Sequence, residues 1–330
     1  MPEAIDITDI HAAADRLKGA ARVTPLLEAD NLNSLAGRRV LVKAECLQRT
    51  GSFKFRGGWS AISALPEEAR RKGVIAFSSG NHAQGVALAA KLHDAPAVIV
   101  MPSDAPAMKI DNTRGYGAEV VLYDRWGESR EEIGAQLAAD RGLTLIKPYD
   151  EPMVMAGQGT CGLEIAAQAA EAGVTEADVI VCAGGGGLLA GVSLALEADA
   201  PGLRPRPAEP KGFDDTARSL VSGRREKITG DETSICDAIV SPMPGELTFP
   251  VNKRLCGPGL VVTDDEARRA MAAAWKHLKV VAEPGGAVAL AAVLSHPDTI
   301  EGDAVICTIS GGNTDPEMFA SAIKEFGDSV

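Results

Sequence analysis

The sequence predicts an α/β protein, because short apolar runs rich in β-branched residues alternate with alanine-rich segments of helical pattern. The apolar runs predict strands at Val40–Val42, Val74–Phe77, Ala97–Met101, Glu119–Tyr123, Leu143–Ile146, Val179–Ala183 and Ala304–Ile309. The intervening segments predict helices at Ala83–His93, Ser129–Arg141, Gly159–Glu171 and Leu188–Glu197. Strands separated by helices of this length are typical of parallel sheets that helices cover on both faces.

Local signals set the limits of several of these elements. Ser129 and Glu132 have the Ser-x-x-Glu spacing of a capping box, which predicts that a helix begins at Ser129. Closely spaced prolines in the segment 201–210 predict a loop, because proline cannot donate the backbone N–H that a sheet requires. The proline-flanked segment 148–152 predicts a break between domains.

Composition limits the classes of partner. The chain has 330 residues, enough for two domains, and its 45% hydrophobic and 24% charged residues are ordinary for a globular protein. Its formal net charge is −12 and it has no block of lysine or arginine, so we expect neither nucleic acid nor a membrane surface as a partner. The charged first twenty residues do not have the pattern of a signal peptide. The six cysteines form no Cys-x-x-Cys pair, as expected for reduced core residues of a cytoplasmic protein.

One long uncharged segment needs separate consideration. Residues 179–196 carry no charge over eighteen positions, which is close to the length that spans a membrane. The segment contains five glycines, four of them consecutive. A strand, a turn and a buried helix therefore explain it better than one membrane-spanning helix.

Lys54 is the most informative residue, because phenylalanines precede and follow it in Phe53-Lys54-Phe55. An amine beside apolar rings is partly desolvated, which lowers its pKa and favours the neutral form that condenses with an aldehyde to a Schiff base. The alternative is a surface lysine whose stem lies on the phenylalanines. Three segments far away in the sequence favour the chemical interpretation.

The first of these segments is a run of four glycines between a predicted strand and a predicted helix, Gly184, Gly185, Gly186 and Gly187. Backbone N–H groups of such a turn can converge on an oxyanion, and the helix start adds a partial positive charge. No lysine or arginine lies between Asp178 and Leu196, so amides and the helix dipole would have to neutralise a bound phosphate. The spacing also fits the loose dinucleotide fingerprint, so a nicotinamide-dependent dehydrogenase is an alternative, as is a tight packing turn.

The other two segments also follow predicted strands. Ser78-Ser79-Gly80-Asn81-His82 presents hydroxyls, an amide and free helix N–H groups, which suit a carboxylate. Capping of the helix by Ser79 or Asn81 is the alternative, and for His82 the alternative is a packed or capping side chain. Ser310-Gly311-Gly312-Asn313 closes the last strand, where a serine hydroxyl can bind a ring nitrogen of a ligand.

Together these segments resemble the serine/threonine dehydratase and serine racemase branch of the fold-type-II (tryptophan synthase β-like) pyridoxal-phosphate enzymes, which includes 3-hydroxyaspartate dehydratases. The similarity covers nearly the whole chain and includes Thr24–Leu26, Lys43–Glu45, Gly157–Thr160 and Glu283–Gly286. The resemblance implies two open parallel-type sheets flanked by helices. It also implies a small domain, 66–151, inserted in a large pyridoxal-phosphate-binding domain, 1–65 and 152–330.

The resemblance also implies roles for individual residues. Lys54 would carry pyridoxal 5′-phosphate covalently, with Phe53 beside it, and Lys54 and Ser79 would be the catalytic residues. Further cofactor contacts would come from the ring-hydroxyl partner Asn81, the phosphate-binding glycines 184–187 and the ring-nitrogen partner Ser310. The candidate substrate-binding residues are Ser79, Asn81, His82 and Arg130.

Two of the predicted ligand contacts have alternative explanations that involve no ligand. Glu209, the Phe213 carbonyl and Asp215 match the loop that holds Mg²⁺, or Ca²⁺ or Mn²⁺, in the racemase-like branch, but they also fit a solvated acidic loop. Arg130 opposes the dipole of its own helix, which suggests an anionic partner such as Glu131 or a second substrate carboxylate. A plain surface arginine is the alternative.

The expected function is therefore a dehydratase, or ammonia-lyase, that releases ammonia and a 2-oxo acid from serine, threonine or 3-hydroxyaspartate. A racemase that uses Lys54 and Ser79 on opposite faces of the substrate is the nearest alternative. The nicotinamide-dependent dehydrogenase is the alternative from another class. The resemblance further implies a homodimer.

Overall fold

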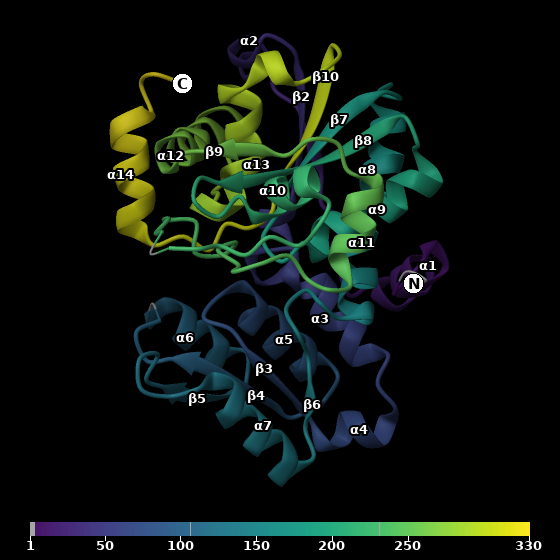
Figure 1. Cartoon of the computed structure of the whole chain (residues 1–330), viewed down its shortest axis with the longest axis vertical. Helices are drawn as coiled ribbons and strands as arrows, with labels where there is room; N and C mark the ends of the chain where they lie inside the picture. The colour runs from purple at the N-terminus through teal and green to yellow at the C-terminus, as the bar shows by residue number, and fades with distance from the viewer. Residues whose placement is uncertain (1–3, 106, 231) are drawn as a thin grey trace.

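Two β-sheets organise the chain, one in each of two lobes (Figure 1). The computed structural model describes residues 4–105, 107–230 and 232–330. The larger sheet has the strand order β1-β2-β10-β7-β8-β9. Its strands are β1 (Leu26–Leu27), β2 (Arg39–Ala44), β7 (Ala177–Cys182), β8 (Leu203–Pro210), β9 (Leu260–Val262) and β10 (Ala304–Ile309). The smaller sheet has the order β5-β4-β3-β6, with β3 (Val74–Phe77), β4 (Ala97–Pro102), β5 (Glu119–Tyr123) and β6 (Thr144–Leu145).

The strands pair in parallel, except that β1 is antiparallel to β2. Both sheets are covered on both faces, which is why their strands read as continuous apolar runs. In β7, Val179 and Val181 face one hydrophobic cluster, while Ile180 and Cys182 face another. The structure therefore confirms the predicted α/β class with two parallel-type sheets.

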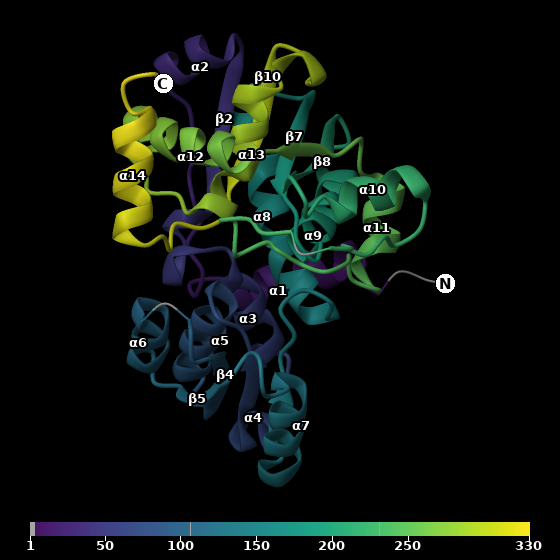
Figure 2. The same cartoon turned by 60° about the vertical axis from the view of Figure 1, so that its left-hand side comes forward.

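Helices form the covering layers (Figure 2). In the larger lobe they are α1 (Ile7–Leu17), α2 (Asp30–Ala36), α8 (Pro152–Glu171), α9 (Gly187–Asp199), α10 (Asp215–Ser222), α11 (Thr248–Leu255), α12 (Asp264–Ala273), α13 (Pro284–Ser295) and α14 (Pro316–Phe326). In the smaller lobe or at its boundary they are α3 (Lys54–Ser63), α4 (Glu67–Lys72), α5 (Asn81–Leu92), α6 (Ala107–Gly115) and α7 (Arg130–Arg141). Short helical turns are η1 (Glu45–Leu47), η2 (Arg49–Gly51), η3 (Ala274–Leu278) and η4 (Pro297–Thr299).

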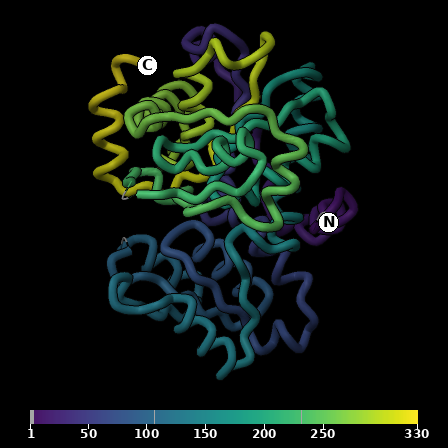
Figure 3. Tube along the Cα trace, in the orientation of Figure 1, coloured from purple at the N-terminus to yellow at the C-terminus, as the bar shows by residue number. Residues whose placement is uncertain are grey.

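The trace passes from the larger lobe to the smaller one and back (Figure 3). The four-stranded sheet occupies residues 74–145, which lie within the range 66–151 predicted for the inserted domain. The domain limits themselves stay a prediction. Helix α7 begins at Arg130 after the N-cap Ser129, whose Oγ accepts a hydrogen bond from the Glu132 N–H at 3.2 Å.

The predicted loop at 201–210 is wrong, because β8 occupies Leu203–Pro210. The backbone nitrogen and carbonyl of Pro205 and Pro207 point away from β7. The Pro205 carbonyl shows this, because it accepts a hydrogen bond from the Gly257 N–H at 2.9 Å. Arg206, the residue between them, faces β7, and β9 pairs with β8 only from Ala208 onward. The two prolines therefore lack an N–H only on the side of β8 that has no paired strand at these positions. Proline is tolerated at such positions, as it is in edge strands.

The uncharged segment 179–196 divides into the end of β7, the glycine turn and most of α9, as predicted. Within the residues that the structure describes, no helix has the length and apolar character needed to cross a membrane. The short strands β1 and β9 were not predicted, because two or three residues are too few to show an alternating pattern.

A buried network of charges fixes α3, the helix that begins at Lys54. The Arg56 guanidinium contacts Glu45 and Glu164, each at 2.7 Å, and Lys43 contacts Glu164 at 2.6 Å. The side chains of Lys43, Glu45 and Arg56 are fully or almost fully buried. Two positive and two negative charges therefore balance one another and connect α3 to β2 and α8.

Helix α9, which begins at the glycine turn, packs on α8 at very short range. A Cβ added at Gly191 would lie 2.5 Å from both the Gly159 nitrogen and the Met155 oxygen, which are backbone atoms of α8. Since backbone cannot move aside as a flexible side chain can, this contact fixes the distance between the two helices.

We expect Gly191→Ala to lower the free energy of unfolding by roughly 1–3 kcal/mol, because overpacking forces the helices apart. Urea denaturation of the cofactor-free protein measures the effect. Gly115→Ala is the matched control, since Gly115 ends α6 with no heavy atom within 4 Å of its added Cβ. Equal stability of the two variants would contradict the proposed constraint.

Candidate active site

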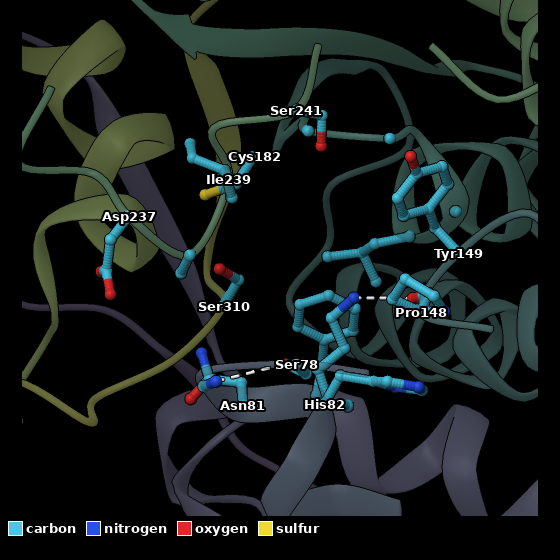
Figure 4. Close-up of a pocket in the computed structure, with 18 of the residues that line it drawn as sticks. Ser78, Asn81, His82, Pro148, Tyr149, Cys182, Asp237, Ile239, Ser241 and Ser310 are labelled. Carbon is cyan, nitrogen blue, oxygen red and sulfur yellow. Dashed lines mark hydrogen bonds between the residues drawn. The ribbon is translucent and has the colours of Figure 1, made fainter. Parts of the chain in front are cut away.

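A pocket lies at the carboxyl ends of strands from both sheets, where ligands bind in open parallel sheets (Figure 4). The turns that follow β3, β7 and β10 supply three of its walls. It is lined by residues of the segments 53–54, 78–82, 148–149, 184–188 and 237–239, and by Ser310. The three segments singled out with Lys54 therefore meet it at one place.

Lys54 presents its amine to this pocket from the first turn of α3. Its Nζ donates a hydrogen bond to the Pro148 carbonyl at 2.7 Å and lies 5.2 Å from the centre of the Phe53 ring. Burial lowers the pKa of the Lys54 amine from 10.5 to about 8, because water no longer stabilises the charged form. At neutral pH a useful fraction of the amine is therefore neutral and nucleophilic.

Phe55 does not share in this environment, although the sequence places it next to Lys54. Its ring packs against Trp59, with 5.8 Å between the ring centres, inside the apolar core of the smaller lobe. Successive residues of a helix differ by about 100° in direction, so Phe55 faces away from the amine. The expectation of a lysine between two rings is wrong, and the pocket wall replaces the second ring.

The glycine turn directs backbone N–H groups towards the pocket. The Gly185 carbonyl accepts from Thr248 Oγ1 at 2.7 Å, and the Gly186 carbonyl accepts from Asn252 Nδ2 at 3.3 Å, both outside the pocket. In a trans peptide the next N–H points the opposite way, so these contacts turn the N–H groups of Gly186 and Gly187 inward. Gly186 has φ +88°, a left-handed conformation that glycine adopts without strain, and it is the N-cap of α9.

The turn is also tightly packed, as the alternative of a packing turn predicts, and its binding of a phosphate stays a prediction. A Cβ at Gly185 would lie 2.2 Å from the ring of Tyr149. Among the described pocket-lining residues, Lys54 is the one lysine or arginine. An anion held by this turn would therefore be neutralised mainly by backbone amides and the dipole of α9.

His82 lines the pocket, but its ring is engaged elsewhere. Its Nε2 lies 2.9 Å from the Ile146 carbonyl and therefore carries the proton that this acceptor requires. Burial, together with the charge of Lys54, lowers the pKa of His82 to about 3, so the ring is neutral over the working pH range. The residue holds the strand end that leads to Pro148, the acceptor of Lys54.

Ser79, Asn81 and Ser310 also line the pocket. Asn81 is the first residue of α5 and is buried, while Ser79 is half-buried in the turn before it. Ser310 is fixed by its backbone, since its N–H donates to Gly286 at 3.2 Å and its carbonyl accepts from Phe53 at 3.1 Å. Figure 4 shows the Ser310 side chain on the pocket side of β10.

Arg130 and the candidate metal ligands do not line this pocket. Arg130 is half exposed and pairs with Glu131, with 2.7 Å between Nε and Oε1. Burial and the charge of Asp150 raise the pKa of Tyr149, a residue of the pocket wall. The positive charge of Arg130 acts in the opposite direction and lowers this pKa. Arg130 therefore interacts electrostatically with Tyr149, which lines the pocket, but does not line the pocket itself.

Glu209 and Asp215 form a separate buried pair that does not line the pocket. Glu209 accepts hydrogen bonds from the N–H groups of Thr216 and Ala217, at 2.9 and 2.7 Å. Neither carboxylate oxygen of Asp215 has a hydrogen-bond partner among the described residues. Burial raises the pKa of Glu209 to about 8, with Asp215 adding, and that of Asp215 to about 7. A buried carboxyl group without a donor, beside a second one, suits a hard cation, although the described residues include no cluster of three His, Cys, Asp or Glu placed to bind a metal.

The sequence analysis missed four polar groups at this site: the Pro148 carbonyl, Tyr149, Asp237 and Glu283. Glu283 gave a usable signal, because a carboxylate in the otherwise apolar run 280–284 demands a partner. The carbonyl of Pro148 gave none, since a backbone acceptor has no residue type.

A buried, partly neutral amine and an amide-lined turn in one pocket define a site suited to a phosphorylated aldehyde. Comparison with known proteins agrees: residues 17–312 match the family described as "Pyridoxal-phosphate dependent enzyme". The chain is 44% identical over 316 residues to an L-threo-3-hydroxyaspartate ammonia-lyase of Pseudomonas sp., covering 96% of this chain and 98% of that protein. It is 41% identical over 318 residues to a serine racemase of Arabidopsis thaliana, covering 94% of each.

Solved structures show the same relation. The structure of maize serine racemase superposes with a TM-score of 0.90 at 37% identity, over 98% of each chain. The chain belongs to the pyridoxal-phosphate dependent enzymes, in the branch that the sequence resemblance indicated. This family excludes the nicotinamide-dependent dehydrogenase that the glycine spacing alone allowed.

The lowered pKa of Lys54 predicts how the cofactor-free protein takes up pyridoxal phosphate. The uptake rate should rise with pH and level off above about 8, where the amine is mostly neutral, instead of rising towards 10.5. Stopped-flow absorbance measures this rate. The same aldehyde reacting with Nα-acetyl-lysine is the control for the cofactor's own ionisations, and a rate that still rises at pH 10 after this correction would refute the lowered pKa.

Proposed function

We propose that the chain is a pyridoxal-phosphate-dependent dehydratase, an ammonia-lyase that converts a β-hydroxy-α-amino acid into a 2-oxo acid and ammonia. The observation that carries the proposal is the pocket that joins the buried amine of Lys54 to the glycine turn. When bound, pyridoxal phosphate supplies an electron sink for the α-carbon of the amino acid. Similarity to an ammonia-lyase over nearly the full length of both chains supports the reaction class.

The residues of the pocket fit the cofactor group by group. We assign covalent attachment to Lys54, packing beside it to Phe53, and the phosphate to the N–H groups of 184–187. We assign the ring hydroxyl to Asn81 and the ring nitrogen to Ser310. A hydroxyl is neutral, so Ser310 does not hold the ring nitrogen protonated as a carboxylate would, and this favours prompt elimination over transamination.

The chemistry needs one proton moved from carbon and one hydroxyl released. Lys54 Nζ, once free and neutral, accepts the α-proton of the substrate. Loss of the β-hydroxyl with that proton removes one water molecule and leaves an enamine. The enamine takes up water again as its imine form hydrolyses, which gives the 2-oxo acid and ammonia.

We propose 3-hydroxyaspartate as the preferred substrate, with serine and threonine as weaker ones. Its α-carboxylate would bind at the turn 78–82, where the N–H groups at the start of α5 are available. Its second carboxylate would pair with the guanidinium of Arg130, whose charge acts on Tyr149 in the pocket wall. A substrate carboxylate would then replace Glu131 as the partner of Arg130.

A racemase is the second candidate function. It requires an acid or base on each face of the α-carbon, and Ser79 lines the same pocket as Lys54. The similarity to a serine racemase of Arabidopsis thaliana supports this candidate. Racemisation and elimination begin with loss of the same proton, so one protein can catalyse both.

We further propose a divalent cation, Mg²⁺ or alternatively Ca²⁺ or Mn²⁺, between Glu209, Asp215 and the Phe213 carbonyl. The unpartnered oxygens of Asp215 support it, because buried carboxylates without donors are costly. Such a cation would stabilise the turn before α10, and it would take no part in the chemistry at Lys54.

A homodimer and a cytoplasmic location stay proposals. The apolar side chains of Leu47 and Val281 are 40% and 43% exposed, on segments that both contact Gly312, and a second copy of the chain would cover them. Light scattering at twice the mass of one chain is the expected result, and the mass of a single chain would refute the dimer.

A substrate panel tests the function. Purified wild type should release ammonia and 2-oxo acid from 3-hydroxyaspartate faster than from serine or threonine, and Lys54→Ala should release none. Arg130→Ala should raise KM for 3-hydroxyaspartate about tenfold or more, the loss of a charge-assisted hydrogen bond, and leave serine unchanged. Chiral analysis of the remaining substrate measures racemisation in the same samples.

Arg125→Ala is the matched control, because Arg125 is an exposed arginine five positions from Arg130 that pairs with Asp104. Activity of Lys54→Ala would refute the proposed reaction. If Arg130→Ala and Arg125→Ala behave alike on 3-hydroxyaspartate, the second-carboxylate contact is wrong. Fast racemisation without ammonia would replace the first function by the second.

The cation is tested by thermal unfolding. Adding Mg²⁺ to chelator-treated protein should raise the unfolding temperature, and Glu209→Gln should abolish that increase because one ligand charge is lost. Asp214→Asn is the matched control, since Asp214 precedes the proposed ligand Asp215 in the sequence but its carboxylate pairs with Arg218. An increase that survives in Glu209→Gln would contradict the site.

A further inference from the structure

We infer that Glu283 and Asn313 are positioning residues that fix the side-chain amide of Asn81 with its N–H₂ group towards the bound cofactor. The inference rests on the proposed contact between Asn81 and the cofactor's ring hydroxyl. It concerns a continuous chain of hydrogen bonds from the Thr50 carbonyl through Asn313 and Asn81 to Glu283. These hydrogen bonds join four segments that are distant in sequence.

Glu283 forms one end of the chain. It is buried, precedes Pro284 at the start of α13, and its Oε1 accepts a hydrogen bond from Asn81 Nδ2. Burial raises the pKa of Glu283 to about 7. Once ionised, its carboxylate accepts but does not donate, so the amide turns its nitrogen towards it. A Cβ at Gly311 would lie 2.0 Å from Oε1, so a glycine at this position makes room for Glu283 to reach Asn81.

The Thr50 carbonyl forms the other end, and it too can only accept. Asn313 Nδ2 donates to it at 2.8 Å and uses its second hydrogen on Asn81 Oδ1, at 2.7 Å. Turning the Asn313 amide over would place its oxygen against the Thr50 carbonyl oxygen. Two acceptors at the ends of two linked amides therefore leave one consistent arrangement of the donors.

Among the described residues this arrangement leaves Asn81 with one N–H that has no acceptor, because its nitrogen carries two hydrogens and Glu283 takes one. Asn81 lines the pocket, so this N–H is available to a ligand there (Figure 4). A donor of fixed direction stabilises a negatively charged oxygen, which the ring hydroxyl of the cofactor becomes when it loses its proton. Thr50 is four residues before Lys54, so the same chain links this contact to the attachment point of the cofactor.

A purely structural role is the competing explanation, because the chain also connects α5 of the smaller lobe to the larger lobe. The two roles differ in what they predict when Asn81 is already removed. A positioning residue then has nothing to act on, whereas a structural contact still contributes to stability.

The test is a double-mutant cycle on cofactor binding, read from fluorescence titration and from the absorbance of the bound cofactor. In Asn81→Ala and in Glu283→Gln we expect the dissociation constant of pyridoxal phosphate to rise about tenfold, the loss of one charge-assisted hydrogen bond. The visible band of the bound cofactor should decrease in favour of the ultraviolet band of the un-ionised ring hydroxyl. Combined with Asn81→Ala, Glu283→Gln should add less than a twofold change.

Asn313→Asp, which removes both donors, should produce the same spectral change. Glu151→Gln is the matched control, because Glu151-Pro152 starts α8 just as Glu283-Pro284 starts α13, and it should leave the spectrum unchanged. Additive effects of Glu283→Gln and Asn81→Ala, or an unchanged spectrum in Glu283→Gln, would overturn the inference. Failure of wild type to bind pyridoxal phosphate would instead refute the proposed function.

Discussion

The rest of the site depends on the removal of water from the amine of Lys54. The hydrogen bond to the Pro148 carbonyl stabilises the charged amine only weakly compared with full hydration, so its pKa falls. His82 supports this arrangement from the smaller lobe, because it holds Ile146 two positions before Pro148. A neutral His82 adds no charge that would push the amine pKa further.

The helix that carries Lys54 is fixed from its opposite side. Arg56 lies two residues after Lys54 and binds two carboxylates in the interior. Burial raises the pKa of Glu45, but Arg56 and Lys43 overcome this and keep it below its usual value. Such a balanced network adds little net stability compared with apolar packing, but removal of one member leaves an unpaired buried charge. It therefore limits the directions in which α3, and with it the reactive amine, can move.

The sequence predicted those parts of the structure that depend on local pattern. Strands β3, β5 and β10 begin and end where the apolar runs predicted. In β3 and β10 almost every residue is buried, and in such a strand of a parallel sheet apolar character alone marks its limits. The turns around Lys54, Asn81 and the glycines were found because their residue types carry chemistry. The direction of Phe55, the acceptor role of Pro148 and the contact of Glu283 with Asn81 depend on tertiary packing, which no local pattern contains. The prediction of a loop at 201–210 was wrong because a proline prevents pairing on only one side of a strand, and β8 pairs with β7 on its other side.

That one-sidedness of β8 has a consequence for the behaviour of the protein in concentrated solution. Along the first half of β8 the outer side of the larger sheet has no paired strand, since β9 begins its pairing only at Ala208, and the Gly257 N–H contacts this side at the Pro205 carbonyl. A sheet margin without a paired strand is a template on which another polypeptide can add itself and start an aggregate. Pro205 and Pro207 present rings instead of donors along this margin, so a foreign strand finds no regular ladder to extend.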